Sequence, residues 1–373
     1  MKQRQYYKSF DILKFICAII IACVYHYQND FPDVTLFANV PFVNKLSMYG
    51  YMLVELFFII SGFLFFVSYF NKIKDNDMNI KTFLKKRYTR LIFVVGITTF
   101  IMFILQQVYY LRNGTFWIWG NNDLGNLLLQ LVGIQHWLEP NIVSLNNAVW
   151  YISVLLLCYI VFFYISKLVV KKKNIFIFLL PVVVALLVQN YGLNIPFLNY
   201  NVTRGLVSFG LGVFLGCLSI NLKNKKFMSI FSFIALLIIG LSYIFLGDPI
   251  VGDLLFFLTF IIYPLLILFL ISIDNKLKFI NNKVTKYLGN LSFGIYLWNL
   301  PIQLATILLN QIFKFNFNYN SLLFFFIQLV IHILIAVVSY HLFERKLLPF
   351  FEKKFIRIIS FLTKTNEINV KGF

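Results

Sequence analysis

Two titratable side chains lie in or beside long apolar stretches near the beginning of the chain. His26 closes the apolar segment 10–27, and Glu55 lies near the start of the next one, in YMLVELFFIISGFLFF. A charge or an imidazole inside a membrane-spanning helix costs kilocalories of free energy unless it is paired or hydrated, so such residues are candidates for a functional site. Two consecutive helices of opposite direction would place both side chains at a similar depth. A carboxylate there could orient the imidazole as a general base, and we expect His26 and Glu55 to form this pair.

The same residues also have an ordinary explanation. Asp11 and Lys14 near the start of the first segment, with His26 at its end, could mark the two membrane interfaces. Glu55 could face an aqueous vestibule. Ser61 follows near the middle of the second segment, where small residues allow helices to approach closely.

Three arginines occupy positions that suggest binding. Arg87 and Arg90 are three residues apart in FLKKRYTRL, so they share one face of a helix that enters the membrane. Planar guanidinium groups suit phosphate recognition, although membrane topology alone also demands a basic loop here. Arg204 lies inside the outer edge of a predicted span, against the charge gradient. It is followed by GLVSFGLGVFLG, whose glycine spacing predicts close helix packing around a polar group.

The last apolar segment contains His332 and His341 and is closed by Glu344 and Arg345. Lone histidines in such a segment are more often packed or interfacial than catalytic. We therefore assign neither histidine to the site.

The composition identifies an integral membrane protein. Of the 373 residues, 60% are hydrophobic and 13% are charged, whereas soluble proteins average about a quarter charged residues. The net charge of +19 comes from short basic runs between apolar segments, a pattern that reflects membrane topology and not nucleic-acid binding. The four cysteines lie within predicted spans at no metal-ligand spacing, so we expect neither a disulfide framework nor a metal site.

We predict an all-α, polytopic membrane bundle of about ten helices, because a span needs about 20 mostly apolar residues. The basic loops alternate in a way that places both termini in the cytoplasm. Residues 1–373 form a single domain without a soluble second domain. Within the long loop 114–146, the segment 124–137 is apolar enough for a short interfacial or re-entrant helix. The predicted spans are 10–28, 49–70, 90–111, 147–169, 174–190, 202–219, 227–246, 251–272, 289–313 and 321–344.

Six segments, taken in order, resemble acyltransferase family 3, a family of integral-membrane O-acyltransferases that are mostly bacterial. They are VELFFIISGFLF, FLKKRYTRL, NAVWYISVLLLCY, RGLVSFGLGVFLG, LGNLSFGIYLWNLPIQ and SYHLFERKL, and they cover nearly the whole chain. The resemblance implies transfer of an acyl group, usually acetyl, from cytoplasmic acyl-CoA to a hydroxyl of a surface glycan or a lipid-linked glycan. It also implies a place in the bacterial plasma membrane, acetyl-CoA as donor substrate without a tightly bound cofactor, and partners from surface-polysaccharide biosynthesis.

The resemblance assigns roles to individual residues. The basic residue and the essential histidine of the family's first helix correspond to Lys14 and His26. The Arg-rich segment on the acyl-CoA side corresponds to Arg87 and Arg90, and the carboxylate of the closing motif corresponds to Glu344. Further residues that we expect to support the site are Ser61, Trp150, Tyr151, Arg204 and Asn299.

The chain departs from the family pattern at three points. The family's basic residue usually precedes the histidine by eleven positions, about 20° apart on a helix, whereas Lys14 precedes His26 by twelve, about 120° apart. A bulge in the helix would be needed to bring both onto one face. Asn299 occupies the position of the usual histidine in the YLWH segment, and asparagine cannot titrate. The extra esterase-like domain of many relatives does not fit in this chain, so it would complete transfer alone or hand over to a separate protein.

The sequence leaves several alternatives open. His26 could act as the general base or could carry the acyl group transiently. A secondary transporter would show a repeated hydropathy pattern or matched interruptions of its helices, and this chain shows neither. An exporter or flippase of a surface glycan, or of its acylated form, is the nearer alternative. The acceptor sugar and the acyl chain length are not indicated.

Overall fold

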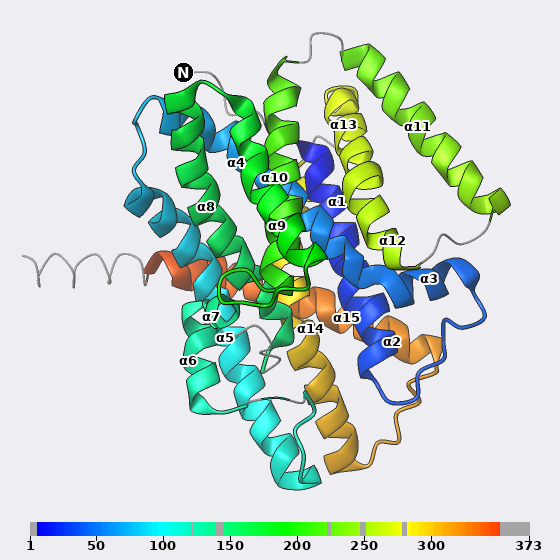
Figure 1. The fold of residues 1–373 in the computed structure, drawn as a ribbon. Coiled ribbons are helices and arrows are strands. Elements are labelled where there is room, and N and C mark those ends of the chain that lie inside the picture. Colours follow the sequence, from blue (N-terminus) through cyan, green and yellow to red (C-terminus); the bar gives the residue numbers. More distant parts are fainter. Residues whose placement is uncertain are drawn as a thin grey trace, which may run out of the picture.

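The computed structural model of the chain describes residues 6–118, 120, 122–138, 145–221, 225–246, 251–277 and 282–350. These residues form a bundle of helices (Figure 1), and none of them lies in a β-strand. Eight helical segments of this described part are long and apolar enough to cross a membrane, which confirms the all-α membrane bundle. They are Lys8–Asp30, Pro41–Lys74, Ile80–Asn113, Asn147–Lys172, Tyr200–Ile220, Leu254–Ile273, Lys283–Phe313 and Leu322–Phe350.

Several of these segments combine helices of different winding. In chain order the helices are α1 (Lys8–Ile19), the π-helix η1 (Ile20–Tyr25), α2 (His26–Asp30), α3 (Pro41–Tyr49), η2 (Gly50–Met52), α4 (Leu53–Lys74), α5 (Ile80–Asn113), α6 (Leu124–Val132), α7 (Gln135–Leu138), η3 (Asn147–Val149), α8 (Trp150–Lys172), η4 (Ile175–Leu179), α9 (Leu180–Asn190), α10 (Tyr200–Asn221), α11 (Lys225–Leu246), α12 (Val251–Phe257), the π-helix η5 (Leu258–Ile262), α13 (Tyr263–Ile273), α14 (Lys283–Phe313), α15 (Leu322–Ser339) and the π-helix η7 (Tyr340–Leu347).

One of the ten predicted spans is shorter than a typical spanning helix. The predicted span 174–190 corresponds to η4 and α9, which together cover Ile175–Asn190. Its first turns form a 3-10 helix, whose rise of about 2.0 Å per residue stretches a short segment over a greater depth. The predicted span 227–246 lies within α11, a helix of 22 residues.

Helices α4 and α10 form the most extensive helix–helix contact of the described bundle. A Cβ atom at Gly62 would lie 2.0 Å from the carbonyl oxygen of Phe209, and one at Gly212 would lie 2.0 Å from that of Ile59. Only glycine permits two backbones to approach this closely, as the glycine spacing after Arg204 predicts. The contact fixes the register of the two helices.

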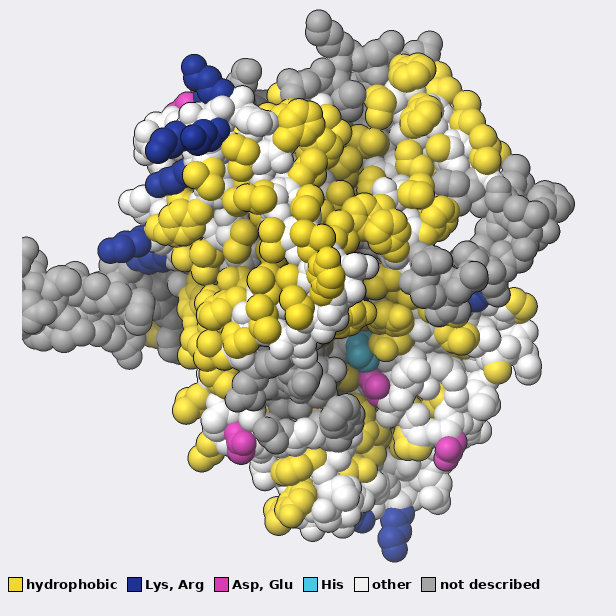
Figure 2. Space-filling model, viewed as in Figure 1, with side chains coloured by type: hydrophobic (Ala, Val, Ile, Leu, Met, Phe, Trp, Pro, Cys, Tyr) yellow, Lys and Arg dark blue, Asp and Glu magenta, His cyan; other side chains and the backbone are white. Residues whose placement is uncertain are grey.

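The bundle has one end rich in basic residues, which we call the basic end. It contains Lys72 and Lys74 in the last turn of α4 and Lys171 and Lys172 in the last turn of α8. Figure 2 shows Lys and Arg side chains at the upper left, above a broad hydrophobic surface. The first helical segment begins at the basic end and reaches His26 near the opposite end, which we call the His26 end.

The long loop 114–146 contains the two short helices α6 and α7. The hydroxyl of Tyr88 on α5 donates to the carbonyl oxygen of Val132 at 3.0 Å, and the indole N–H of Trp137 donates to the carbonyl oxygen of Ser153 on α8 at 2.9 Å. The segment therefore folds back against two spanning helices, in the region where the sequence predicts a short interfacial or re-entrant helix.

Candidate functional site

His26 is oriented by a carboxylate on its own helix. Its Nδ1 lies 2.6 Å from Oδ2 of Asp30, one turn further along α2. Residues four apart on an α-helix are neighbours on one face. A carboxylate that accepts the Nδ1–H holds the ring in the tautomer whose Nε2 accepts a proton. Asp30, and not Glu55, therefore orients His26, and the predicted pairing of His26 with Glu55 is wrong.

Glu55 is instead the partner of Arg204. Its Oε1 lies 2.6 Å from Nε and 2.5 Å from Nη2 of the guanidinium, and both side chains are buried. The guanidinium also lies over the rings of Trp150, at 5.0 Å, and Tyr200, at 5.4 Å. A buried cation requires a counter-charge, and Arg204 takes the carboxylate predicted to orient His26. Both contacts fall on Oε1, so Oε2 has no hydrogen-bond partner among the described residues.

Two tyrosines connect the two pairs. The ring of Tyr25 lies 4.9 Å from the ring of His26 and 5.6 Å from that of Tyr51. Tyr51 in turn lies within electrostatic range of both Glu55 and Arg204. The His26–Asp30 pair and the Glu55–Arg204 pair are thus neighbouring parts of one polar region.

The π-helix η1 lies between Lys14 and His26. A π-turn accommodates one residue more than an α-turn, so twelve residues that include it rotate like eleven residues of α-helix. The two side chains then lie about 20° apart around the axis, and about 18 Å apart along it. Tight packing accompanies this irregularity, because a Cβ atom at Gly50 of η2 would lie 2.8 Å from Cβ of Tyr25. The structure therefore contains the bulge that the twelve-residue spacing requires.

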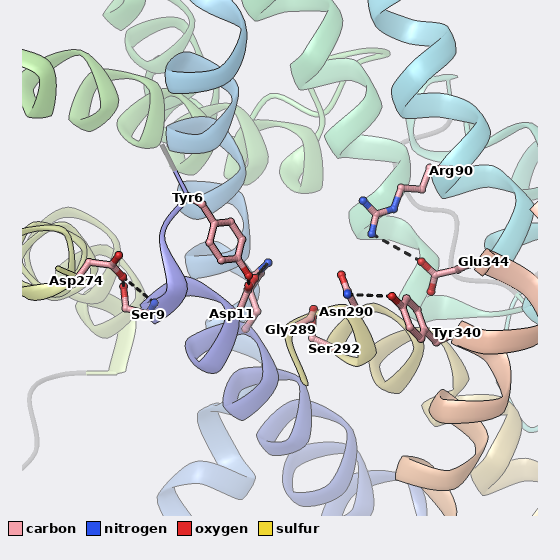
Figure 3. Close-up of polar contacts among 11 residues, drawn as sticks. Tyr6, Ser9, Asp11, Arg90, Asp274, Gly289, Asn290, Ser292, Tyr340 and Glu344 are labelled. Atoms are coloured by element: carbon pink, nitrogen blue, oxygen red, sulfur yellow. Dashed lines mark hydrogen bonds and ion pairs between the residues drawn. The ribbon is translucent and has the colours of Figure 1, made fainter. Parts of the chain in front are cut away.

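Lys14 belongs to a set of polar contacts at the basic end. Its Nζ lies 2.8 Å from Oδ1 of the buried Asp11, which also accepts a hydrogen bond from the hydroxyl of Tyr6. Ser9 donates from its backbone N–H at 2.8 Å and its hydroxyl at 2.7 Å to Oδ1 of Asp274 (Figure 3). These contacts tie the start of α1 to the end of α13.

Arg90 and Glu344 form the other half of this set. Nη2 of Arg90 lies 3.8 Å from Oε2 of Glu344, and the amide of Asn290 donates to the hydroxyl of Tyr340 at 3.1 Å. Figure 3 shows that these residues project from α5, α14 and η7 toward the region beside Asp11. The buried Oε1 of Glu344 has no hydrogen-bond partner in the described part of the chain.

Arg87 has different surroundings from Arg90, although the two share one helix. Its guanidinium carbon lies 4.8 Å from the ring centre of Tyr69 on α4 and 5.5 Å from that of Tyr159 on α8. The side chain of Arg90 is 57% exposed. Arg87 is therefore stacked against two aromatic rings, whereas Arg90 is accessible.

The remaining predicted site residues lie in two places. Trp150 stacks on Arg204, and the hydroxyls of Ser61 and Tyr151 lie 3.1 Å apart. Asn299 is buried in α14, where its Oδ1 accepts a hydrogen bond of 2.5 Å from the backbone N–H of Leu300. Asn299 is therefore held by its own helix.

Two residues near His26 are absent from the site predicted from the sequence. Asp30 carries a recognisable signal, an acidic residue four positions after the histidine. His332 lies within the last apolar segment and is not assigned to the predicted site, because its proximity to His26 depends on the packing of α15. It is buried within electrostatic range of His26, its Nδ1 lies 2.7 Å from the carbonyl oxygen of Gln328, and its Nε2 has no partner among the described residues.

In the described ranges, no group of three or more His, Cys, Asp or Glu side chains is arranged to hold a metal ion. A family model with the description "Acyltransferase domain" matches residues 7–341. Comparisons with curated proteins and with solved structures returned no match.

Proposed function

The chain belongs to acyltransferase family 3, whose model spans residues 7–341, and from this premise we propose that it is an O-acetyltransferase. Family membership and the eight apolar spans make it a multi-pass membrane acyltransferase. In our proposal the donor is cytoplasmic acetyl-CoA. The acceptor is a hydroxyl of a cell-surface polysaccharide or of its lipid-linked precursor, and the membrane is the bacterial plasma membrane with both termini in the cytoplasm.

The observation that carries this proposal is the geometry of the first spanning segment. The π-helix η1 brings Lys14 and His26 onto one face, about 18 Å apart along the helix. One face therefore presents a cation toward the basic end and an oriented imidazole toward the His26 end. A donor whose phosphates bind at the basic end could extend its acyl group along this face toward His26.

The chemistry requires a base, because an alcohol is a poor nucleophile until its proton is removed. In the direct route, Nε2 of His26 takes the hydroxyl proton while the oxygen attacks the thioester carbonyl. The carbon–sulfur bond then breaks, and the proton passes to the departing thiolate. Asp30 stabilises the imidazolium that forms in between. In the alternative route, Nε2 attacks the thioester, the carbon–sulfur bond breaks and the thiolate of CoA leaves. The hydroxyl oxygen then attacks the acetyl group on Nε2, the carbon–nitrogen bond breaks, and the hydroxyl proton passes to the released imidazole.

The basic end would hold the donor. Arg90, which is exposed, and Lys14, which has a single carboxylate partner in Asp11, can both reorient toward phosphate oxygens. Arg87 between its two tyrosine rings would present a fixed planar donor. Glu344 would keep Arg90 in place until the donor arrives.

The test is to incubate membranes that contain the protein with acetyl-CoA labelled in the acetyl group. We expect a base-labile label on the surface polysaccharide or on its lipid-linked precursor, and no label when His26→Ala replaces the wild type at equal abundance. A chain that moves a glycan across the membrane but transfers no label would instead be an exporter or flippase.

A further inference from the structure

A cavity of 460 Å³ lies beside the Glu55–Arg204 pair, between α9, α10 and the segment α12–η5. Its size falls within the range of small-molecule sites, about 300–1,000 Å³. His26 is not among the residues that line it. The cavity is therefore a neighbour of the catalytic histidine proposed above, and that proposal assigns it no role.

The wall of this cavity contains three buried polar atoms without partners in the described residues. They are Oε2 of Glu55, Oγ of Ser208 and Oγ1 of Thr259, from residues that are 1%, 1% and 4% exposed. Buried polar atoms in folded proteins are almost always hydrogen-bonded. A carboxylate oxygen can only accept, whereas a hydroxyl can donate or accept. The residues that carry these atoms line the cavity, so a ligand with hydroxyl groups offers the donors and acceptors that the three oxygens lack.

The charges of the cavity favour an uncharged ligand. Among the described residues that line it, only Glu55 and Arg204 are charged, and each neutralises the other. The rest of the lining is hydroxyl, amide, aromatic and aliphatic. An added phosphate or carboxylate would compete with Glu55 for the guanidinium, and an added cation would compete with Arg204 for the carboxylate.

The exposed residues of the lining, which we call the mouth of the cavity, are mostly apolar, although Gly192 and Asn194 are among them. Leu193, Tyr200 and Phe256 line it and are 50%, 58% and 56% exposed. Phe256 lies near the beginning of the spanning segment Leu254–Ile273, and Tyr200 is the first residue of the segment Tyr200–Ile220. The mouth therefore lies near a membrane interface, where the headgroups of lipids are found.

We propose that this cavity binds the neutral, hydroxyl-bearing headgroup of a glycolipid, which enters from the membrane past this mouth. The inference rests on the proposed function, since it identifies the acceptor as the lipid-linked form. A headgroup on the Glu55 side would be separated from His26 by the neighbouring rings of Tyr25 and Tyr51. These rings would form the passage through which a hydroxyl reaches the imidazole.

The test uses the full chain in nanodiscs of phosphatidylcholine without acyl-CoA, titrated with radiolabelled monoglucosyl diacylglycerol. We expect saturable binding that unlabelled monoglucosyl diacylglycerol displaces, while phosphatidylglycerol and free glucose at the same concentrations do not. Ser208→Ala and Thr259→Val each remove one hydroxyl with little change in volume. Each should weaken binding about five-fold, the equivalent of one hydrogen bond of about 1 kcal/mol.

Two matched controls remove buried hydroxyls outside the cavity. Ser166 donates to the carbonyl oxygen of Phe162 at 2.7 Å, and Thr98 donates to that of Val94 at 3.1 Å. Ser166→Ala and Thr98→Val should bind the glycolipid like the wild type.

Each other outcome overturns a stated part of the proposal. Displacement by free glucose would identify a site for a soluble sugar, and displacement by phosphatidylglycerol would identify a site for an anionic headgroup. Unchanged affinity in both cavity variants would place the binding elsewhere on the protein. The binding assay contains no acyl-CoA, so it does not depend on the transfer assay described above. Glycolipid binding in a protein that transfers no acetyl group would contradict only the proposed function. Acetyl transfer by a protein that does not bind the glycolipid would contradict only this inference.

Discussion

Oε1 of Glu55 accepts two contacts from Arg204, at 2.6 Å from Nε and 2.5 Å from Nη2, across 149 residues of chain. The glycine contact between α4 and α10 makes this possible, because it fixes the two backbones in one register. The pair lies under the rings of Trp150 and Tyr200 and beside the cavity. It gives the bundle a neutral polar centre near the His26–Asp30 pair.

This pair should be required for stability. Glu55→Gln or Arg204→Gln alone leaves one buried charge without a partner, which costs about 3–5 kcal/mol of the free energy of unfolding. The double variant should be more stable than either single variant, because it leaves no charge behind. Thermal unfolding of the purified protein in detergent measures the difference, with the exposed Lys72→Gln as control. A single variant as stable as the wild type would show that the pair is dispensable.

His26 should be required for acetyl transfer, and Asp30 should increase the rate of this transfer. His26→Gln should lower the rate about 10²- to 10⁴-fold, the usual contribution of a general base, at unchanged abundance. Asp30→Asn should lower it less, because the imidazole remains but loses the charge that stabilises its protonated form. Transfer of labelled acetyl in membranes measures both, and the exposed Asp33→Asn should have no effect. Full activity of His26→Gln would remove the histidine from the mechanism.

The π-helix should matter through the rotation that it imposes. After deletion of Cys23, Lys14 precedes His26 by eleven positions, so a regular α-helix places both side chains on one face. Activity should then be largely retained. Inserting one alanine after Ile21 turns His26 by about 100° and should abolish transfer. An alanine inserted after Asp77, in the loop between α4 and α5, serves as control. If the deletion is as harmful as the insertion at equal abundance, the shared face is not what η1 provides.

Arg87 and Arg90 should bind the donor. Replacing either by alanine should raise the KM for acetyl-CoA about 10-fold or more, since hydrogen bonds to charged groups contribute about 1.5–3 kcal/mol. Arg87→Lys should restore little, because an ammonium group cannot stack as a plane between Tyr69 and Tyr159. Lys86→Ala, an exposed neighbour, should leave the KM unchanged. An unaltered KM in the double alanine variant would leave these arginines only a role in membrane topology.

His136 should make stability depend on pH. This residue lies outside the spanning segments, and burial lowers its pKa from the usual 6.5 to about 4. The unfolded chain therefore binds a proton that the folded chain does not, so stability is complete above pH 6.5 and falls as the pH drops toward 4. The loss attributable to His136 is up to about 3 kcal/mol. Unfolding midpoints between pH 7 and pH 4 should fall less for His136→Gln, and parallel curves would contradict this assignment.

The sequence by itself determines the class of the protein and many of its parts. Apolar length and basic loops predict the helical membrane bundle, because hydropathy is a local property that each helix carries in its own residues. The order of six motifs indicates the family, and the position of His26 within its segment marks it as a candidate. The twelve-residue spacing from Lys14 even indicates that the helix needs a bulge, although it does not show where the bulge lies.

Only the tertiary structure decides which polar groups meet. Glu55 pairs with Arg204 because α4 and α10 pack at glycines, and His26 turns to Asp30 on its own helix. His332 reaches the neighbourhood of His26 through the packing of α15. The partner of a buried charge depends on which helices become neighbours and in what register. The spacing of residues that lie far apart in the chain does not predict this. The cavity beside Glu55 has the same origin, since α4, α9, α10 and the segment α12–η5 all contribute to its lining.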